Sequence, residues 1–283
     1  MSDVVREVKK NILQPGLLLM LLGIPFLCML SGCYLDDTGK EYTVFEMVIR
    51  QSDMDVAAII ELNQLAVWKA GMGVWFFLFA PCLLTVGYMI TVSAERKSGN
   101  IRFVLIREGR LRYCISKLTG LALTGGMLLV AGYGIYGCLT ALLFPPLSSY
   151  SDELRQSYLE MAGIDNIRFY ITGRLLGSFL YGVGVSVFGA FVSIYFRDRY
   201  MLMCIPLLIN YMYTQMILKA EIDRLEDFEF VNAINRFRIE NLLDVKWNMD
   251  WYITLIYVLA LYLICFILFY FHIRGRRDSG DWV

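Results

Sequence analysis

Side chains that could do chemistry are sparse, and their types argue against a catalytic centre in this chain. His272 is the only histidine among the 283 residues, which rules out a multi-histidine metal site and disfavours a histidine-assisted hydrolase. The seven cysteines have no metal-ligand spacing, no G-x-x-x-x-G-K-[S/T] sequence occurs, and no apolar run contains paired carboxylates. We therefore expect a chain that is not itself an enzyme and binds no metal, no other cofactor and no nucleic acid.

One group of polar side chains lies within a long apolar run at 200–218. Its members are Asn210, Tyr211, Thr214 and Gln215. Polar side chains inside a membrane span either bond neighbouring helices together or line a pathway. Asn210 and Gln215 are five residues apart, about 140° around a helix, so they cannot both bond one partner in the same way. We predict that these four residues line a translocation path, with bonding between helices as the alternative.

Small residues are concentrated in another apolar run, at 169–196. Gly173 and Gly177 form a G-x-x-x-G pair, and Ser178 and Gly182 repeat the four-residue spacing. Such spacing lets helices approach closely. We predict that Gly173, Gly177 and Gly182 pack helices together, either within one subunit or at a dimer seam. Arg174, near the outer end of this run, is expected to extend to the membrane interface.

A charged island at 95–117 separates two apolar runs. Seven Lys and Arg residues are opposed there only by Glu95 and Glu108, which gives a net charge of +5 and predicts a cytoplasmic loop. Inside the island lie five large apolar residues, Ile101, Phe103, Val104, Leu105 and Ile106. Gly99 and Gly109 flank them, which predicts a short helix with a breaker at each end. Five apolar residues predict a contact with the bilayer surface or with another protein.

Composition places the whole chain in a membrane. It is 58% hydrophobic and 18% charged, whereas soluble domains have about 45–50% apolar and about 25% charged residues. Because a span needs about 20 apolar residues, six spans are predicted, at 14–33, 71–94, 118–144, 169–196, 200–218 and 251–272. The predicted fold class is an all-α membrane protein, with residues 1–283 forming a single transmembrane domain.

The segments between the spans predict the topology. Segments 34–70, 145–168 and 219–250 are predicted to be external, and an apolar repeat from Val56 to Val67 predicts an external helix leading into the second span. Placing both termini in the cytoplasm puts 15 of the 26 Lys and Arg residues inside with only 7 of the 26 acidic residues. The inside charge is then +8 and the outside charge −8, in agreement with the positive-inside rule.

Residues 1–13 are predicted to form an amphipathic helix at the cytoplasmic membrane surface. Val4, Val5, Val8 and Ile12 fall on one helical face, while acidic and basic residues occupy the rest of the segment. A frayed extension of the first span is the alternative.

Together these features resemble the permease subunits of type-2 ABC exporters. In that family a Glu at the inner end of the second span is followed by a Gly, an apolar coupling segment, a basic turn, and a Lys opening the third span. The matching positions here are Glu95, Gly99, 101–106, 107–112 and Lys117. The family commonly has a proline after the apolar segment, where this chain has Glu108 and Gly109.

The resemblance implies half of a membrane channel, paired with itself or with a related permease. A separate subunit would bind ATP and Mg and dock on the coupling segment. From its position at the inner end of the second predicted span, the Glu95 carboxylate is expected to hold the basic loop in position. The docking residues implied are Glu95, Gly99, Ile101, Arg102, Phe103, Val104, Leu105, Ile106, Arg107 and Arg110.

The location implied is the plasma or inner membrane of a bacterium, in contact with lipid. Exported peptides, drugs and lipids all suit such a channel. One alternative is a membrane-embedded enzyme or accessory protein without an ATPase partner. Another is a passive channel or secondary transporter, which is disfavoured because no carboxylate or histidine lies at the middle of a span.

Overall fold

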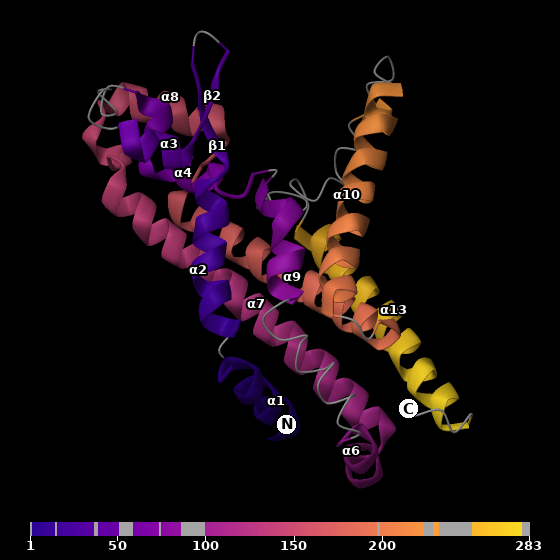
Figure 1. Ribbon diagram of the computed structural model, residues 1–283. Helices are drawn as coiled ribbons and strands as arrows, with labels where there is room; N and C mark the ends of the chain where they lie inside the picture. The colour runs from indigo at the N-terminus through magenta and orange to yellow at the C-terminus, as the bar shows by residue number, and fades with distance from the viewer. Residues whose placement is uncertain are drawn as a thin grey trace.

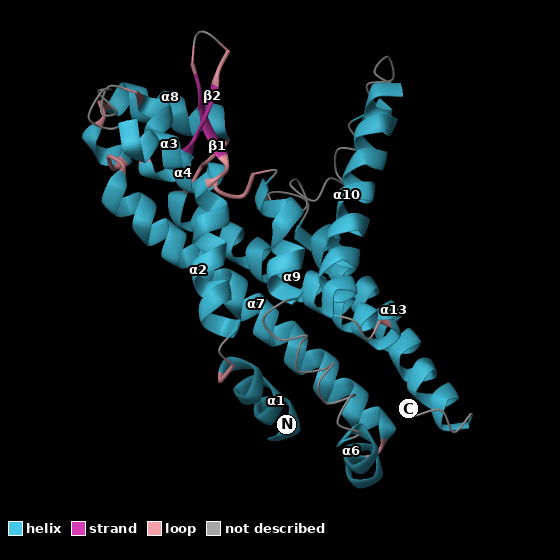
Figure 2. Cartoon of the chain, in the orientation of Figure 1, coloured by secondary structure: helices cyan, strands magenta, loops and turns pink. Residues whose placement is uncertain are grey.

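Most of the described chain is helical, and its helices are arranged along one long central helix (Figure 1, Figure 2). The computed structural model describes residues 2–14, 16–36, 39–50, 59–73, 75–85, 100–196, 199–223, 229–231 and 251–278. The central helix, α7 (Arg110–Leu143), has 34 residues and extends about 50 Å. Packed against it are α1 (Ser2–Ile12), α2 (Gly16–Met29), α4 (Gln64–Ala70), α6 (Asn100–Glu108), α9 (Ile167–Tyr195) and α13 (Trp251–Asp278). Another helix, α10 (Arg199–Asp223), packs on α9.

Small residues let α7 and α9 approach closely. A Cβ atom added at Gly182 of α9 would lie 2.6 Å from the carbonyl oxygen of Gly125 and 2.9 Å from the Cα of Gly126. No side chain fits there without moving the backbone, so glycine is required on both helices. Gly182 therefore packs two helices of one chain, and Gly173 and Gly177 are also buried in α9.

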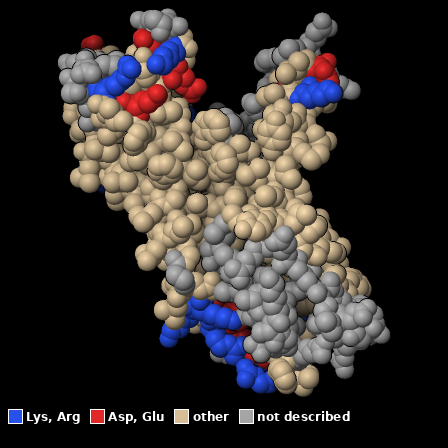
Figure 3. All heavy atoms as spheres, in the orientation of Figure 1, with Lys and Arg blue, Asp and Glu red and all other residues tan. Residues whose placement is uncertain are grey.

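The two ends of the molecule carry different elements. Figure 1 places α1, α6 and the last turns of α13 at one end. The opposite end holds a hairpin of β1 (Gly32–Leu35) and β2 (Glu41–Thr43), together with α3 (Val44–Ile49), η4 (Leu147–Ser149) and α8 (Asp152–Ala162). On the face drawn in Figure 3, charged side chains gather at the ends and uncharged residues fill the middle.

The helices have the length and composition of a membrane protein. Four segments can cross a bilayer, within Arg110–Ser149, Asp152–Ser193, Tyr200–Asp223 and Thr254–Ile273. Two further helix pairs pass the same test when each pair is taken together, but both are sharply bent. The bend is 70° between α1 and α2 and 64° between α4 and the helix Trp75–Thr85. The described part of the chain thus has four candidate spans, or up to six if each bent pair is one span.

The first predicted span, 14–33, is longer than the helix that the structure has there. Its helix, α2, has 14 residues and measures about 21 Å, less than the roughly 30 Å hydrocarbon core of a bilayer. It ends at Met29 because the chain turns and enters β1 at Gly32. Within the second predicted span, 71–94, the structure describes the helix Trp75–Thr85, which is bent by 64° from α4; residues 86–94 lie outside the described residues.

The described residues are consistent with the predicted all-α membrane protein, and a short two-stranded hairpin is a feature that the prediction lacked. Tyr34 pairs with Tyr42 and Leu35 with Glu41 in an antiparallel ladder, with an irregularity between Gly32 and Tyr34. Gly39 lies in the turn with a φ of 79°, a conformation that favours glycine. Residues typical of a turn separate the two tyrosine-containing strands, so the sequence did contain a hairpin signal.

The predicted continuous external helix is wrong around Asn63. Ile59 and Asn63 have extended backbones on either side of a short 3-10 helix, η3 (Ile60–Leu62). The side chain of Asn63 accepts hydrogen bonds from the backbone N–H groups of Leu65 and Ala66, so it caps α4. The apolar repeat crosses a helix boundary, while residues 51–58 lie outside the described residues.

Helices also extend into segments predicted to be loops. The basic turn after α6 contains the start of α7 at Arg110, and the basic tail forms the end of α13 at Asp278. Similarly, α10 continues to Asp223, and α8 forms within the predicted external segment 145–168. Arginine and lysine favour helices, so hydropathy locates the apolar part of a helix better than its ends. Residues 224–228 and 232–250 of the last external segment lie outside the described residues.

Arg174, which was predicted to extend to the membrane interface, lies inside the protein. Its side chain is buried, and Nη2 donates a 2.8 Å hydrogen bond to the carbonyl oxygen of Lys69 near the end of α4. A cation at this position is favoured by the dipole of α4, which places partial negative charge at the C-terminal end of that helix. Arg174 therefore connects α9 to α4.

The arrangement gives a testable topology. With Cys138 and Cys204 replaced by serine, Arg107→Cys in α6 should react with an impermeant maleimide only after cells are opened. Lys40→Cys in the exposed hairpin should react in intact cells, because the hairpin lies at the opposite end of the molecule from α6. Labelling of Arg107→Cys from outside intact cells would reverse the proposed orientation.

Candidate functional site

The predicted short helix in the basic island is confirmed as α6. It has nine residues, Asn100–Glu108, and Gly109 follows it with a φ of 79°. Gly109 precedes the first residue of α7, so α6 is joined directly to the central helix. Glu95 and Gly99 lie outside the described residues, as do the side chains of Ile101 and Arg102.

The described apolar residues of α6 divide into two sets. Val104 and Leu105 are half-buried against the apolar core, which they help to attach to α6. Phe103 and Ile106 are 75% and 83% exposed. They are three residues apart, so they lie on the same side of the helix. The exposed companion of Phe103 is thus Ile106 and not Leu105.

Glu108 connects α6 to the N-terminal helix. Its side chain is 8% exposed, and it accepts a charge-assisted hydrogen bond from Arg6 of α1 and another, at 3.2 Å, from Arg107. The bond from Arg6 is the main reason that the pKa of Glu108 is lowered below its usual value. The carboxylate is therefore charged at neutral pH, and this contact is lost only as the pH falls through that lowered pKa. Arg107 is exposed and Arg110 is half-buried.

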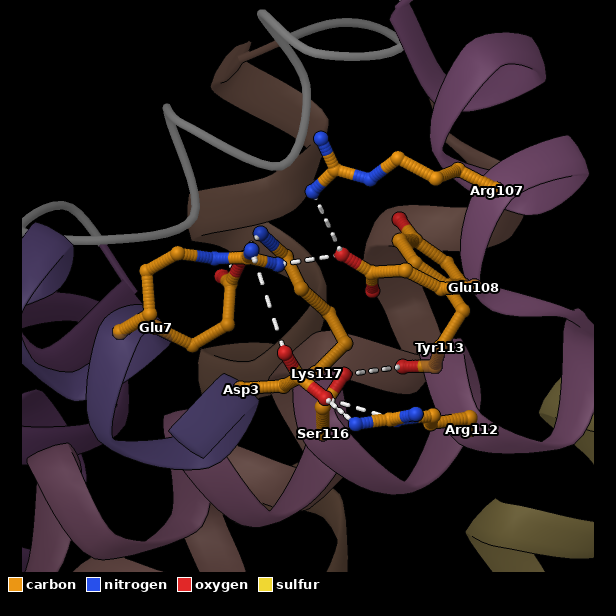
Figure 4. Close-up of polar contacts among 9 residues, drawn as sticks. Asp3, Glu7, Arg107, Glu108, Arg112, Tyr113, Ser116 and Lys117 are labelled. Atoms are coloured by element: carbon orange, nitrogen blue, oxygen red, sulfur yellow. Dashed lines mark hydrogen bonds and ion pairs between the residues drawn. The ribbon is translucent and has the colours of Figure 1, made fainter. Parts of the chain in front are cut away.

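A polar face of α1 lies along the first turns of α7 (Figure 4). Arg112 forms an ion pair with Asp3 at 2.6 Å, and Lys117 forms one with Glu7 at 2.7 Å. The Lys117 side chain is 1% exposed and that of Glu7 is 14% exposed, so this pair is largely removed from solvent. Gly120 makes room for it, because an added Cβ there would lie 2.8 Å from the Cβ of Glu7.

The opposite face of α1 exposes two apolar side chains, with Lys9 between them. Val5 and Ile12 are 60% and 45% exposed, seven residues apart on the side of the helix that does not contact α7. The helix is therefore amphipathic, with its acidic residues toward the protein. Sequence reasoning placed only Glu95 and Glu108 against the basic island, because ion pairs between residues about 110 positions apart leave no local signal. The i,i+4 spacing of Asp3 and Glu7 was the available indication of a shared face.

A cavity of about 210 Å³ lies between the helix Trp75–Thr85, α9, α10 and α13. Of the four residues predicted to line a path, only Asn210 borders it. Thr214 donates to the carbonyl oxygen of Asn210 in its own helix, at 3.0 Å, and Tyr211 and Gln215 are exposed. The structure thus separates residues that the sequence grouped together.

Asn210 also has a specific partner. Pro81 has no backbone N–H group, so the carbonyl oxygen of Phe77, four residues earlier, lacks its usual helical donor. Asn210 Nδ2 donates to that oxygen at 2.6 Å, and the Tyr181 hydroxyl donates to it at 3.2 Å. Asn210 thus bonds two helices together, as the alternative interpretation requires, and also borders the cavity.

We expect the cost of losing Asn210 to depend on Pro81. Asn210→Leu should destabilise the protein by about 1 kcal/mol, the typical net contribution of a hydrogen bond. With Pro81→Ala, residue 81 regains an N–H group that can bond to Phe77, so Asn210→Leu should then cost less than half as much. A double-mutant cycle of thermal unfolding in detergent measures this coupling. If Asn210→Leu destabilised the original chain and the Pro81→Ala variant equally, the hydrogen bond to the Phe77 carbonyl would not be the contribution of Asn210 to stability.

No family model matches the sequence, and no curated protein matches it either.

Proposed function

We propose that the chain is the membrane-spanning permease subunit of an ATP-driven exporter, and that α6 is the docking surface for a separate ATP-binding subunit. The observation that carries this proposal is the exposure of Phe103 and Ile106 on a short helix surrounded by basic residues. Large apolar side chains exposed together on a charged end of a protein are typical of an interaction surface.

The contacts of α6 with the rest of the chain would let it transmit a displacement from a docked partner. A nine-residue helix is too short to be stable alone in water, so it depends on its contacts. Val104 and Leu105 anchor it to the core, and the Glu108–Arg6 ion pair anchors it to α1. A partner that pushes on α6 therefore displaces α1 and the start of α7 together.

A displacement of α6 can be transmitted to the membrane-spanning helices through α7. This helix extends about 50 Å, and α9 packs along it at the glycine contact of Gly125 and Gly182. Packed helices of this kind shift as rigid elements between discrete arrangements. We propose that ATP binding and hydrolysis in the partner subunit, with its Mg, drive alternating access in a channel formed by two such permeases.

The proposal includes a membrane, a partner permease and a class of substrate. The chain would work in the plasma or inner membrane of a bacterium, as a homodimer or with a related permease, and export a peptide, drug or lipid. Its own residues would form the path and the docking surface and hold no nucleotide.

Purification of the tagged chain from its native membrane tests the proposal. We expect an ATP-binding subunit to co-purify with it and to hydrolyse ATP, at a rate raised by the transported substrate. A chain purified intact in a mild detergent, without any ATP-binding protein and without ATP hydrolysis, would instead favour a membrane-embedded enzyme or accessory protein.

A further inference from the structure

The cavity beside Asn210 is a cleft with α9 as its floor. It is lined by Gly184 of α9, Ile209 of α10, Val258 of α13 and Pro81 of the helix Trp75–Thr85. Two of its lining residues, Ile209 and Tyr257, are 46% and 43% exposed, so the cleft opens onto the molecular surface between α10 and α13.

The cleft lies at the depth of the hydrocarbon core. Asn210 is 11 residues from the start of α10 and 13 from its end, so it lies about 16–20 Å from both ends of a candidate span. A bilayer core is roughly 30 Å thick, which places Asn210 near its middle. A cleft that opens at this depth can be reached by the lipid chains of the bilayer.

The walls select an apolar occupant. Most lining residues are aliphatic or aromatic. Two polar lining groups, the Asn210 amide and the Tyr181 hydroxyl, already donate to the Phe77 carbonyl oxygen. Tyr213 and Thr254 also interact within the chain, and the remaining polar lining group is the hydroxyl of Tyr257, a residue that is 43% exposed. A polar ligand would find few groups to bond with there, whereas a hydrocarbon chain gains dispersion contacts along the apolar walls.

The volume of the cleft limits which apolar group can occupy it. Sites for drug-sized ligands measure about 300–1,000 Å³, and the cleft has about 210 Å³. A helix with its side chains is about 10 Å across, so a second copy of the chain could insert a side chain but not a helix. We propose that the cleft binds one acyl chain of a bilayer phospholipid. This inference needs the membrane location but not an ATP-binding partner, so the two proposals can fail separately.

Gly184 offers a way to fill the cleft. A Cβ added there meets only Leu261 Cδ2, at 3.6 Å, which is an ordinary contact, so Gly184→Leu should fold. Gly134→Leu is the matched control, because an added Cβ at Gly134 meets nothing within 4 Å and Gly134 does not line the cleft. Ile209→Trp at the exposed rim is a second filling variant that leaves the floor unchanged.

The experiment uses the purified full chain in phosphatidylcholine–phosphatidylglycerol vesicles that contain a phospholipid with a diazirine at mid-chain. After irradiation, mass spectrometry compares the label on Tyr213 and Tyr257 with that on Leu263 and Ile264, which are exposed on α13 outside the cleft. We expect this ratio to fall about tenfold in Gly184→Leu, equivalent to about 1.4 kcal/mol of binding free energy, and in Ile209→Trp. Gly134→Leu should leave it unchanged.

Two results would overturn the inference. An equal ratio in the original chain and in both filling variants would mean that no acyl chain occupies the cleft. A disulfide between two copies carrying Ile209→Cys and Cys204→Ser, with no cleft labelling, would assign the cleft to a second copy of the chain.

Discussion

Phe103→Ala is expected to leave membrane insertion intact, to weaken co-purification of the ATP-binding subunit about thirtyfold and to abolish transport. Phe103 is 75% exposed, so its truncation removes little packing within the chain. Aromatic side chains buried in an interface are frequent hot spots, with truncation costing about 2 kcal/mol or more. The measurement is the amount of ATP-binding subunit retained by the tagged chain at equal expression.

Two further variants define the docking surface. Ile106→Ala should weaken co-purification as well, because Ile106 is 83% exposed on the same side of α6 as Phe103. Leu142→Ala, at the far end of α7 and 82% exposed, is the matched control and should change nothing. Unchanged co-purification and transport in Phe103→Ala would mean that this face of α6 rests on lipid or that another residue anchors the partner.

Lys117→Met is expected to lower the free energy of unfolding by about 3 kcal/mol or more, because it leaves the Glu7 carboxylate without its ion-pair partner in a largely buried position. Methionine keeps much of the length and apolar stem of lysine, so loss of charge dominates the effect. Thermal unfolding in detergent measures the loss, and protease cleavage within α1 reports whether that helix detaches.

A double variant separates the ion pair from packing. Adding Glu7→Gln to Lys117→Met removes the unpaired charge and should restore much of the stability. The nearby Asp3–Arg112 pair is the matched control, since the Arg112 side chain is 63% exposed and Arg112→Ala should cost about 1 kcal/mol or less. Similar losses in Lys117→Met and Arg112→Ala would contradict a special role for the buried pair.

Features set by local composition could be predicted from the sequence. The apolar run at 169–196 matches α9 closely. The helix breakers Gly99 and Gly109 immediately flank α6, so they predicted its first and last residues. Helix ends were less predictable, because α7 and α13 continue through basic residues that hydropathy assigns to loops. The hairpin was missed because its strands are short and lie within a segment whose helical repeat dominated the interpretation.

Features set by contacts between distant residues could not be predicted. The Lys117–Glu7 pair joins residues 110 positions apart, and Arg174 reaches a carbonyl 105 positions away. The role of Asn210 depends on Pro81, which frees the Phe77 carbonyl in another helix. The expectation that Glu95 holds the basic loop stays a prediction. In the described structure, the carboxylates that contact basic residues of this loop are those of Glu108, Asp3 and Glu7.

The central claim is that α6 docks an ATP-binding subunit, and a photoreactive phenylalanine analogue at position 103 tests it most directly. Irradiation of intact cells should join the chain to a protein that contains a G-x-x-x-x-G-K-[S/T] nucleotide-binding sequence, identified by mass spectrometry of the adduct. The same analogue at position 142 should not capture that protein. Adducts at position 103 with lipid alone, or only with another copy of this chain, would contradict the claim.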